Sequence, residues 1–439
     1  MRVLSAEYVL PVGSPPIKNG AVAIEEGRIA AVGDIKAIAE SYPDAKNTHF
    51  PAAAILPGLV NCHSHLEVTA LRGALDDVEH DFRSWLLRLN DLRGEMTDGD
   101  ILNSALLGAK EGAAAGVTCF GDIGRFGHAG MTALKQIGLR GIVFQETEFS
   151  PDSRTAMNDL KALAERFDEL AEQATPLVQI GISPHSPYTV SSSLFESIAQ
   201  FSIMNRVPIT IHVSESREEM DLLINGSGFF TEVYDKFGVE WHSPHCSPIE
   251  YLERLGVLAA RPLLAHCVHA SDSDLERIAA YGARIAHCPR SNAKFGHGTA
   301  PLAKMLSAGN TVGLGSDSVA SSNSCDLIEE ARTAAYFSRL LDPESGFISA
   351  AKAIEMATLG GAAALGMADE IGSLEPGKQA DLAVVSLSST AQLPIHDIEA
   401  AIVFSSNARD IAMTMVAGRA VYEREETPSA TWPTLPQGL

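Results

Sequence analysis

Eight short apolar runs, separated by stretches with helical character, constrain the fold of this chain more than any other feature. Continuous apolar runs are typical of parallel strands that are buried on both faces. Stretches such as 100–115 and 271–280 provide the helices that connect such strands. Eight β-α units in one domain predict an α/β fold, the (β/α)8 TIM barrel. The runs are 52–60, 117–122, 141–146, 178–185, 207–212, 262–266, 283–287 and 311–317.

Both ends of the chain have a different pattern, with short β segments and frequent glycine. Residues 20–33 are typical of a hairpin, and short strands are expected at 372–386, 398–405 and 413–422. We therefore expect the two ends to fold together as one small β-sandwich domain, in which Asp381 and Gly418 are turn or register residues. The predicted domains are residues 1–56 for the first part of the sandwich, 57–365 for the barrel and 366–439 for the second part.

Composition excludes several classes of protein. The chain has 55 acidic and 33 basic residues and a formal net charge of -22, whereas nucleic acids and anionic membranes bind basic patches. No apolar run approaches the roughly 20 residues of a membrane span, and the N-terminus lacks the pattern of a signal peptide. The six cysteines are scattered without a CxxC pair, which favours reduced thiols. We therefore expect a cytoplasmic protein with a small-molecule substrate, and neither nucleic acid nor membrane as a partner.

Ligand-type side chains follow five of the eight apolar runs. The first run leads into His63 and His65, whose i, i+2 spacing places both imidazoles on the same side of a strand. Any one such residue alone is typical of a capped strand end or a turn. Because the carboxyl ends of barrel strands meet at one catalytic face, the set as a whole predicts a metal site there. The remaining members are His185, His212, His266 and Asp317.

Five motifs, spread over nearly the whole chain, resemble the amidohydrolase superfamily of metal-dependent hydrolases. They are PGLVNCHSHLE at 57–67, HVSES at 212–216, HCVH at 266–269, GSDS at 315–318 and GSLEPGKQADLAVV at 372–385. Within the superfamily the chain is most similar to cytosine, guanine and adenosine-derivative deaminases and to triazine hydrolases. Such relatives are commonly dimers or larger, so the resemblance also implies a homo-oligomer.

The resemblance implies that His63, His65, His212 and Asp317 are ligands of one divalent metal ion. Three histidines and an aspartate accept zinc, iron or manganese, and we expect zinc. Two-metal members of the superfamily use a lysine from the fourth strand, and residues 183–188 contain no lysine, which favours a single ion. A two-metal site with His266 as a further ligand stays open.

Glu215 follows His212 by three residues, which places a carboxyl group beside the metal without making it a ligand. Taken alone, Glu215 would be an exposed charge in the acidic run 215–221. Beside the expected ligand set, its position suits a proton shuttle. We therefore expect Glu215 to be catalytic, together with His266 and Asp317.

The expected function is the hydrolytic deamination of an aminopurine nucleoside derivative, with release of ammonia after attack of a metal-activated hydroxide on the ring. In this scheme Asp317 accepts the water proton, and Glu215 protonates the adjacent ring nitrogen. His266 orients the water and stabilises the developing oxyanion. Hydrolysis of an amide, a formimino group or a C–Cl bond on the same scaffold stays open as the alternative. A non-catalytic relative is disfavoured because every expected ligand is present.

Five residues are expected to bind the substrate, partly through the same resemblance. His185 resembles a substrate-binding histidine of adenosine-derivative deaminases, and Glu67 could bind a sugar hydroxyl or a ring donor. Arg72 and Trp85 resemble the loop that closes over the ligand, although Trp85 could equally pack within a helix. Arg290 would match a carboxylate, unless it forms a surface salt bridge. Together with the resemblance, Arg290 favours a substrate of the aminodeoxyfutalosine or S-adenosylhomocysteine type. No role is assigned to His128, His242, His245, His269 and His297.

Overall fold

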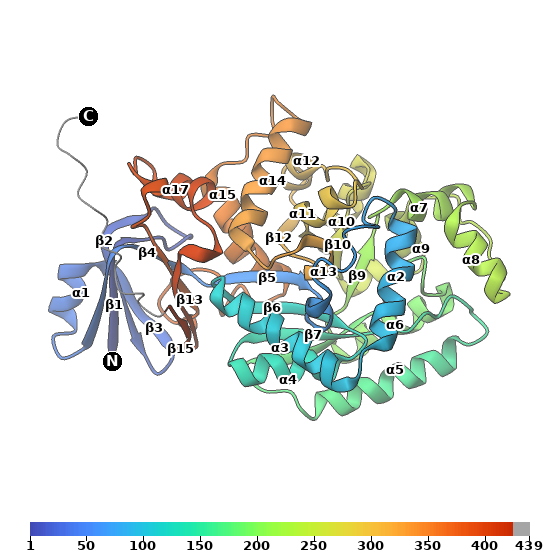
Figure 1. The fold of residues 1–439 in the computed structure, drawn as a ribbon, viewed down its shortest axis with the longest axis horizontal. Helices are drawn as coiled ribbons and strands as arrows, with labels where there is room; N and C mark the ends of the chain where they lie inside the picture. The colour runs from blue at the N-terminus through green and yellow to red at the C-terminus, as the bar shows by residue number, and fades with distance from the viewer. Residues whose placement is uncertain (425–439) are drawn as a thin grey trace.

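The computed structural model describes residues 1–424 and contains a closed barrel of eight parallel strands (Figure 1). The strands form two hydrogen-bonded groups of four, each in sequential order. Parallel bridges between Ile182 and Ile209 and between Ser64 and Asp317 join the two groups into a barrel. The predicted TIM barrel is confirmed. Its strands are β5 (Leu59–Ser64), β6 (Val117–Gly124), β7 (Arg140–Glu146), β8 (Val178–Ser183), β9 (Thr210–Val213), β10 (Leu263–His266), β11 (Arg284–His287) and β12 (Thr311–Leu314).

Helices surround the barrel, and their ends carry local signals that the sequence encodes. The side chain of Thr97 accepts a hydrogen bond from Asp100 N, and the Asp100 carboxylate accepts one from Thr97 N, so a capping box begins α3. A Cβ atom at Gly112 would lie 2.2 Å from Cζ of Phe120, so only glycine lets α3 approach β6 so closely. The outer helices include α3 (Asp98–Ala114), α4 (Gly127–Ile137), α5 (Ala156–Ala171), α6 (Ser192–Asn205), α10 (Asp272–Tyr281), α14 (Leu327–Leu341) and α15 (Ala350–Glu355).

The first apolar run belongs to two strands rather than one. Strand β4 (Lys46–Pro57) is part of the sheet formed by the chain ends, and β5 begins the barrel at Leu59. Gly58 separates them, and a Cβ atom there would lie 2.1 Å from Oγ1 of Thr118. The prediction of a single strand over 52–60 was therefore wrong, because the continuous apolar pattern hides a change of sheet.

The two ends of the chain form a separate seven-stranded mixed sheet beside the barrel (Figure 1). Its order is β15-β14-β13-β4-β1-β2-β3, and the β1–β4 pair is parallel whereas its other neighbouring strands are antiparallel. Ile24 and Met413, from opposite halves of that order, belong to one buried cluster, so the sheet curls around a shared core. Residues 425–439 of the last predicted segment lie outside the described residues. The strands not yet given are β1 (Arg2–Val9), β2 (Ile17–Glu25), β3 (Arg28–Asp34), β13 (Leu382–Ser386), β14 (Ile411–Val416) and β15 (Arg419–Glu423).

One predicted strand is a helix. Residues 398–405 form α17 (Ile398–Ser405), which begins where the side chain of Asp397 accepts a hydrogen bond from Ala400 N at 3.0 Å. Ile398, Ala401 and Ile402 are buried, the i, i+3, i+4 spacing of a helix face. The apolar segment is so short that its periodicity alone does not distinguish a strand from a buried helix.

The sequence also led to expectations about membrane-spanning segments and about the cysteines. Within residues 1–424, no helix combines the length and the apolar character that crossing a membrane requires. All six cysteines lie in this part of the chain, and each is buried and free of a disulfide.

A buried ion pair connects the barrel to the chain-end sheet. Nε of Arg140, at the start of β7, donates to Oδ2 of Asp381 at 2.7 Å, and a second guanidinium nitrogen donates to Oδ1 at 3.1 Å. The Arg140 side chain is 8% exposed and that of Asp381 is 1% exposed. Asp381 also accepts a hydrogen bond from Ala417 N at 2.7 Å. Asp381 therefore fixes the turn, as expected, and also neutralises a charge on the barrel.

We predict that Asp381→Asn lowers the free energy of unfolding by about 3–5 kcal/mol, because it leaves the Arg140 charge buried without a counter-ion. Asparagine keeps an acceptor for Ala417 N, so the loss reports on the charge. Urea denaturation followed by circular dichroism measures the change. The control is Lys304→Ala, which removes an exposed pair with Asp272 and should cost less than about 1 kcal/mol. Equal losses in the two variants would contradict the account.

Candidate metal centre and active site

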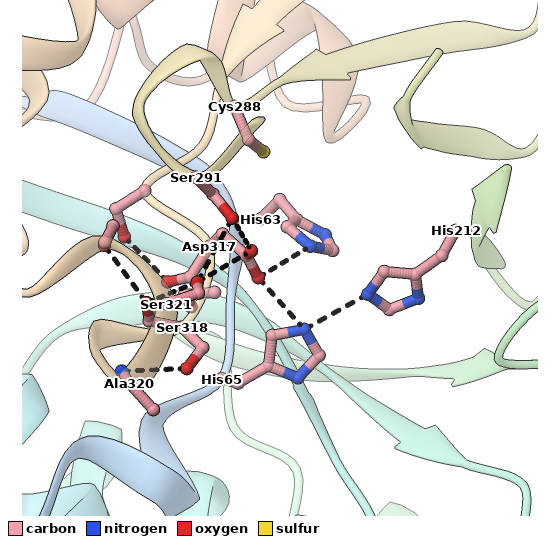
Figure 2. Close-up of polar contacts among 12 residues, drawn as sticks. His63, His65, His212, Cys288, Ser291, Asp317, Ser318, Ala320 and Ser321 are labelled. Atoms are coloured by element: carbon pink, nitrogen blue, oxygen red, sulfur yellow. Dashed lines mark hydrogen bonds and ion pairs between the residues drawn. The ribbon is translucent and has the colours of Figure 1, made fainter. Parts of the chain in front are cut away.

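Four side chains converge where the barrel strands end (Figure 2). His63 lies on β5, His65 directly follows that strand, His212 lies on β9 and Asp317 follows β12. Nε2 of His65 is 3.2 Å from Nε2 of His212 and 3.5 Å from Oδ1 of Asp317. Nε2 of His63 is also 3.5 Å from that oxygen. The structure thus brings together the complete set of ligands that the sequence predicts.

The spacing of these atoms fits a divalent metal ion. Nitrogen and oxygen ligands at bond lengths of about 2.0–2.2 Å from a tetrahedral ion lie roughly 3.3–3.5 Å apart, as these do. Both ring nitrogens of buried His63 lack a hydrogen-bond partner in the described chain, which costs free energy, and a bound metal would satisfy Nε2, the nitrogen that faces Asp317. Nδ1 of His212 lies 3.1 Å from the carbonyl oxygen of His185, so it carries the proton and leaves Nε2 free as a ligand.

Asp317 is held in position by its backbone and by two serines. Its φ of 57° is in the left-handed region, and its N–H donates to the carbonyl oxygen of His63 at 3.0 Å. Ser291 Oγ and Ser321 Oγ donate to Oδ2 at 2.5 and 2.9 Å, so Oδ1 is the oxygen that faces the histidines. Burial opposes ionisation of Asp317, but His63, whose Nε2 lies 3.5 Å away, and the other surrounding imidazoles outweigh it and hold the pKa well below its ordinary value.

Glu215 lies beside this centre without belonging to it. Its carboxylate is buried, with Oε1 3.6 Å from Nε2 of His266 and 3.7 Å from Nε2 of His297. Its backbone N–H donates to Oε2 of Glu219 at 2.9 Å, which fixes the turn after β9. Burial raises the pKa of Glu215 to about 7, although nearby His266 acts in the opposite direction. A carboxyl group with such a pKa can give and take a proton near neutrality.

His266 is oriented by a residue from the next barrel segment. Its Nδ1 lies 2.9 Å from Oδ1 of Asn292, which can only accept, so Nδ1 carries the proton of the neutral ring. Nε2 is therefore a buried lone pair directed toward the centre, and it has no hydrogen-bond partner within the described chain. This geometry suits an acceptor for a water hydrogen.

A cavity of about 550 Å³, counting its open mouth, lies directly above these groups. One wall is apolar and comes mainly from α2 (Phe82–Glu95), with Phe295 from the barrel. The ring of Phe295 lies edge-on to Trp85 at 4.7 Å between centroids and to Phe82 at 5.5 Å. The other residues that line it are His65, Glu67, Val68, Leu86, Leu89, Arg93, Glu146, Tyr188, His212, Glu215, His266, Asp317 and Ser318.

Three of the predicted substrate-binding residues lie at or beside this cavity. Trp85 and Glu67 line it, and Glu67 is buried and accepts hydrogen bonds from the backbone N–H groups of Arg125 and Phe126. His185 lies beside His212, with 4.7 Å between ring centroids. Its Nε2 is 3.9 Å from Oε1 of Glu146, so the ring lies next to the cavity lining.

The other two predicted residues do not line the cavity. Arg290 donates to Ser324 Oγ at 2.7 Å and lies 3.7 Å from Glu330 and 3.5 Å from Glu329, so its charge is already paired. Arg72 pairs with Glu111, next to a different hollow between the barrel and the chain-end sheet. The geometry therefore gives no support to their assignment to substrate binding, which stays a prediction, because both guanidinium groups are paired with acidic residues of the fold.

The structure also places three residues at the site that sequence reasoning missed. Glu146, at the end of β7, lines the cavity, and its Oε1 has no hydrogen-bond partner in the described chain. Arg93 lines the cavity from α2 and lies 3.3 Å from Glu67. His297 lies against Glu215. Only Glu146 carried a usable signal, because it ends a predicted barrel strand.

Comparisons with known proteins agree with this geometry. Residues 54–421 match the amidohydrolase family. The chain belongs to the amidohydrolase family. Residues 20–45 also match the imidazolonepropionase-like composite domain of bacteria. The match confirms the resemblance to the amidohydrolases that the five sequence motifs indicated, and it covers most of this chain.

Individual relatives define the enzyme class more narrowly. The chain is 32% identical over 426 residues to a 5-methylthioadenosine/S-adenosylhomocysteine deaminase of Desulforudis audaxviator, covering 96% of this chain and 93% of the relative. An adenosine deaminase from Xanthomonas campestris with bound zinc is similar in structure, with a TM-score of 0.83, 28% identity and coverage of 95% and 92% of the two chains. The expected class, a hydrolytic deaminase with a divalent metal ion, is confirmed for this amidohydrolase.

A more distant structure confirms the fold alone. The Helicobacter pylori aminofutalosine deaminase in complex with methylthio-coformycin has a TM-score of 0.81 and 23% identity, and the match covers 96% of this chain and 100% of that one. Its barrel and flanking sheet therefore resemble those of this amidohydrolase.

We predict that the purified protein carries one divalent metal ion per chain and that His212→Ala loses most of it, because three donors hold an ion less tightly than four. Elemental analysis by inductively coupled plasma mass spectrometry measures the content. His128→Ala is the matched control, since it removes an exposed histidine on α4. Equal metal content in the two variants would refute the ligand set.

Proposed function

We propose that this chain deaminates adenosine derivatives substituted at the 5′ position, replacing the 6-amino group of the purine by oxygen. The observation that carries the proposal is buried Glu215, which lines a cavity together with the ligand cluster and an aromatic wall. Deamination of a ring amidine needs a water-activating centre and an acid that can reach the ring nitrogen. The curated relative at 32% identity, named for two such adenosine derivatives, supports the same substrate class.

Each residue has a chemical role in this proposal. A divalent ion held by His63, His65, His212 and Asp317, for which we propose zinc, supplies an activated water. Asp317 accepts the proton that the water loses. Nε2 of His266 accepts a hydrogen bond from the same water and orients it. Glu215 protonates the ring nitrogen next to the reacting carbon and recovers a proton from the new hydroxyl group as the carbonyl forms. The proton held by Asp317 passes to the departing ammonia, so both carboxyl groups return to their starting states.

The aromatic side chains of the cavity wall suit the binding of a planar base. Phe82, Trp85 and Phe295 present apolar surface to the cavity, and a purine stacked there would exclude water from the reacting carbon. His185, just after β8, and Glu146, at the end of the neighbouring strand β7, offer polar groups for the base or sugar edge. We propose that Glu67 binds a ribose hydroxyl, since its buried carboxylate faces the same space.

The 5′ substituent is the least defined part of the substrate. A carboxylate on that substituent, as in S-adenosylhomocysteine or aminodeoxyfutalosine, requires a cation, and Arg290 is turned toward Glu329 and Glu330 instead. Among the described residues that line the cavity, Arg93 is the one guanidinium. Arg93 also pairs with Glu67 at 3.3 Å, but unlike Arg290 it lines the cavity. We therefore propose that Arg93 binds the carboxylate of such substrates, whereas the apolar side chains of α2 contact the thioether or aryl part.

We predict that metal-replete protein releases ammonia from 5′-methylthioadenosine, S-adenosylhomocysteine or aminodeoxyfutalosine, and that Glu215→Gln lowers kcat by roughly a hundredfold to ten-thousandfold. A coupled assay for ammonia, with loss of the adenine absorbance as a second signal, measures both rates. Guanine, cytosine and a chlorotriazine complete the panel. Turnover of the chlorotriazine alone, or full activity of Glu215→Gln, would overturn the proposal.

We predict that Arg93→Gln separates the two kinds of substituent. The variant should lower kcat/KM for S-adenosylhomocysteine by roughly tenfold or more, because a charge-assisted hydrogen bond to the carboxylate is lost. The value for 5′-methylthioadenosine should fall less, since that substrate has no carboxylate and is affected only through the lost Arg93–Glu67 pair. Arg290→Gln is the matched control and should leave the ratio of the two values unchanged. A shifted ratio in Arg290→Gln, with none in Arg93→Gln, would return the carboxylate to Arg290.

A further inference from the structure

His297 lies in the loop after α11 (Pro289–Lys294), and its ring is directed at Glu215. The residue is 7% exposed, and its Nε2 is a buried polar atom without a hydrogen-bond partner in the described chain. That atom is 3.7 Å from Oε1 of Glu215. This separation is longer than a formed hydrogen bond, but catalytic contacts of this length tighten when substrate binds.

Glu215 Oε1 therefore lies between two imidazoles, His266 and His297, at nearly equal distances. The two rings differ in what they can offer. The neutral ring of His266 has its proton on Nδ1, which is committed to Asn292, so its Nε2 cannot donate to Glu215. His297 has no such contact to another described side chain, and its neutral ring can carry the proton on Nε2. Of the two, His297 is thus the donor that the Glu215 carboxylate can use without a change of charge.

The ring of His297 is also fixed by the wall of the cavity. It lies edge-on to Phe82, the first residue of α2, at 4.7 Å between centroids, and 5.2 Å from Phe295. Both aromatic residues line the substrate cavity, whereas His297 itself does not. His297 consequently connects the catalytic carboxylate to the helix that covers the substrate.

We propose that His297 is a positioning residue, whose Nε2–H donates to Oε1 of Glu215 and holds that carboxylate in the orientation that reaches the substrate ring. The inference rests on the proposed function, because it gives Glu215 the role of proton shuttle. His297 touches neither the substrate nor the metal ligands in this account, so its effect should appear in the chemical step rather than in substrate binding.

The kinetic test uses two substitutions of different chemistry. His297→Leu, which removes the donor, should lower kcat by roughly tenfold to a hundredfold, the range for a hydrogen bond to a charged group, with KM nearly unchanged. His297→Gln places an amide N–H near the same point and should recover most of the rate. Melting temperature and metal content should match the wild type in both variants. If the two variants are equally slow, His297 contributes packing alone and the inference fails.

A double-mutant cycle separates this inference from the proposed function. In the Glu215→Gln background, His297→Leu should cause little further loss, because the group on which His297 acts is already gone. Full activity of Glu215→Gln would remove the proposed function itself. An inactive Glu215→Gln together with a fully active His297→Leu would remove only the inference.

A spectroscopic measurement tests the contact without turnover, in protein with an unreactive purine nucleoside bound, since the contact shortens when the cavity is filled. In protein labelled with nitrogen-15 at histidine, the His297 signals, identified by their loss in His297→Gln, should report the neutral ring with its proton on Nε2. Glu215→Gln should shift those signals, whereas the control Glu218→Gln should not. A proton on Nδ1, or signals that ignore Glu215, would overturn the inference whatever the enzyme acts on.

Discussion

The whole site depends on the hydrogen bond from Asp317 N to the carbonyl oxygen of His63, 3.0 Å long, which joins the last barrel strand to the first. The same contact closes the barrel and brings the Asp317 carboxylate against the imidazoles of β5. Buried lone pairs that face each other at 3.2–3.5 Å destabilise the fold unless a cation lies among them. We therefore expect barrel closure and metal binding to be coupled, with the proposed metal centre at the contact that closes the barrel.

Burial and the neighbouring polar groups set the pKa values of the two carboxyl groups at this site. Asp317 stays ionised because imidazoles and two serine hydroxyls stabilise its charge. Burial instead raises the pKa of Glu215 to about 7, and within residues 1–424 no hydrogen bond to its carboxylate is formed. Two carboxyl groups near each other thus acquire opposite tendencies, one to accept a proton and one to deliver it. Helix α2 then covers them with aromatic surface, which excludes water from the reacting atoms.

The sequence predicted those site residues whose position depends only on where a barrel strand ends. His63, His65, His212 and Asp317 could be predicted because parallel strands must end at the same face. Contacts between distant segments could not be predicted from the sequence. Arg290 meets Glu330, and Arg72 meets Glu111, only because the segments that carry them pack together. His297 gave no signal for the same reason, because only the folded loop directs it at Glu215. Residues 398–405 were ambiguous because a short apolar segment fits a strand or a helix.

The most direct test of the account follows the oxygen atom. Metal-replete enzyme would be incubated with S-adenosylhomocysteine, and separately with 5′-methylthioadenosine and with aminodeoxyfutalosine, in water enriched in heavy oxygen, and the product analysed by mass spectrometry. The account predicts a hypoxanthine product with solvent oxygen on C6 and an equal amount of ammonia. Unchanged adenine in all three substrates, or a product whose new oxygen lies anywhere other than C6, would contradict hydrolytic deamination at this centre.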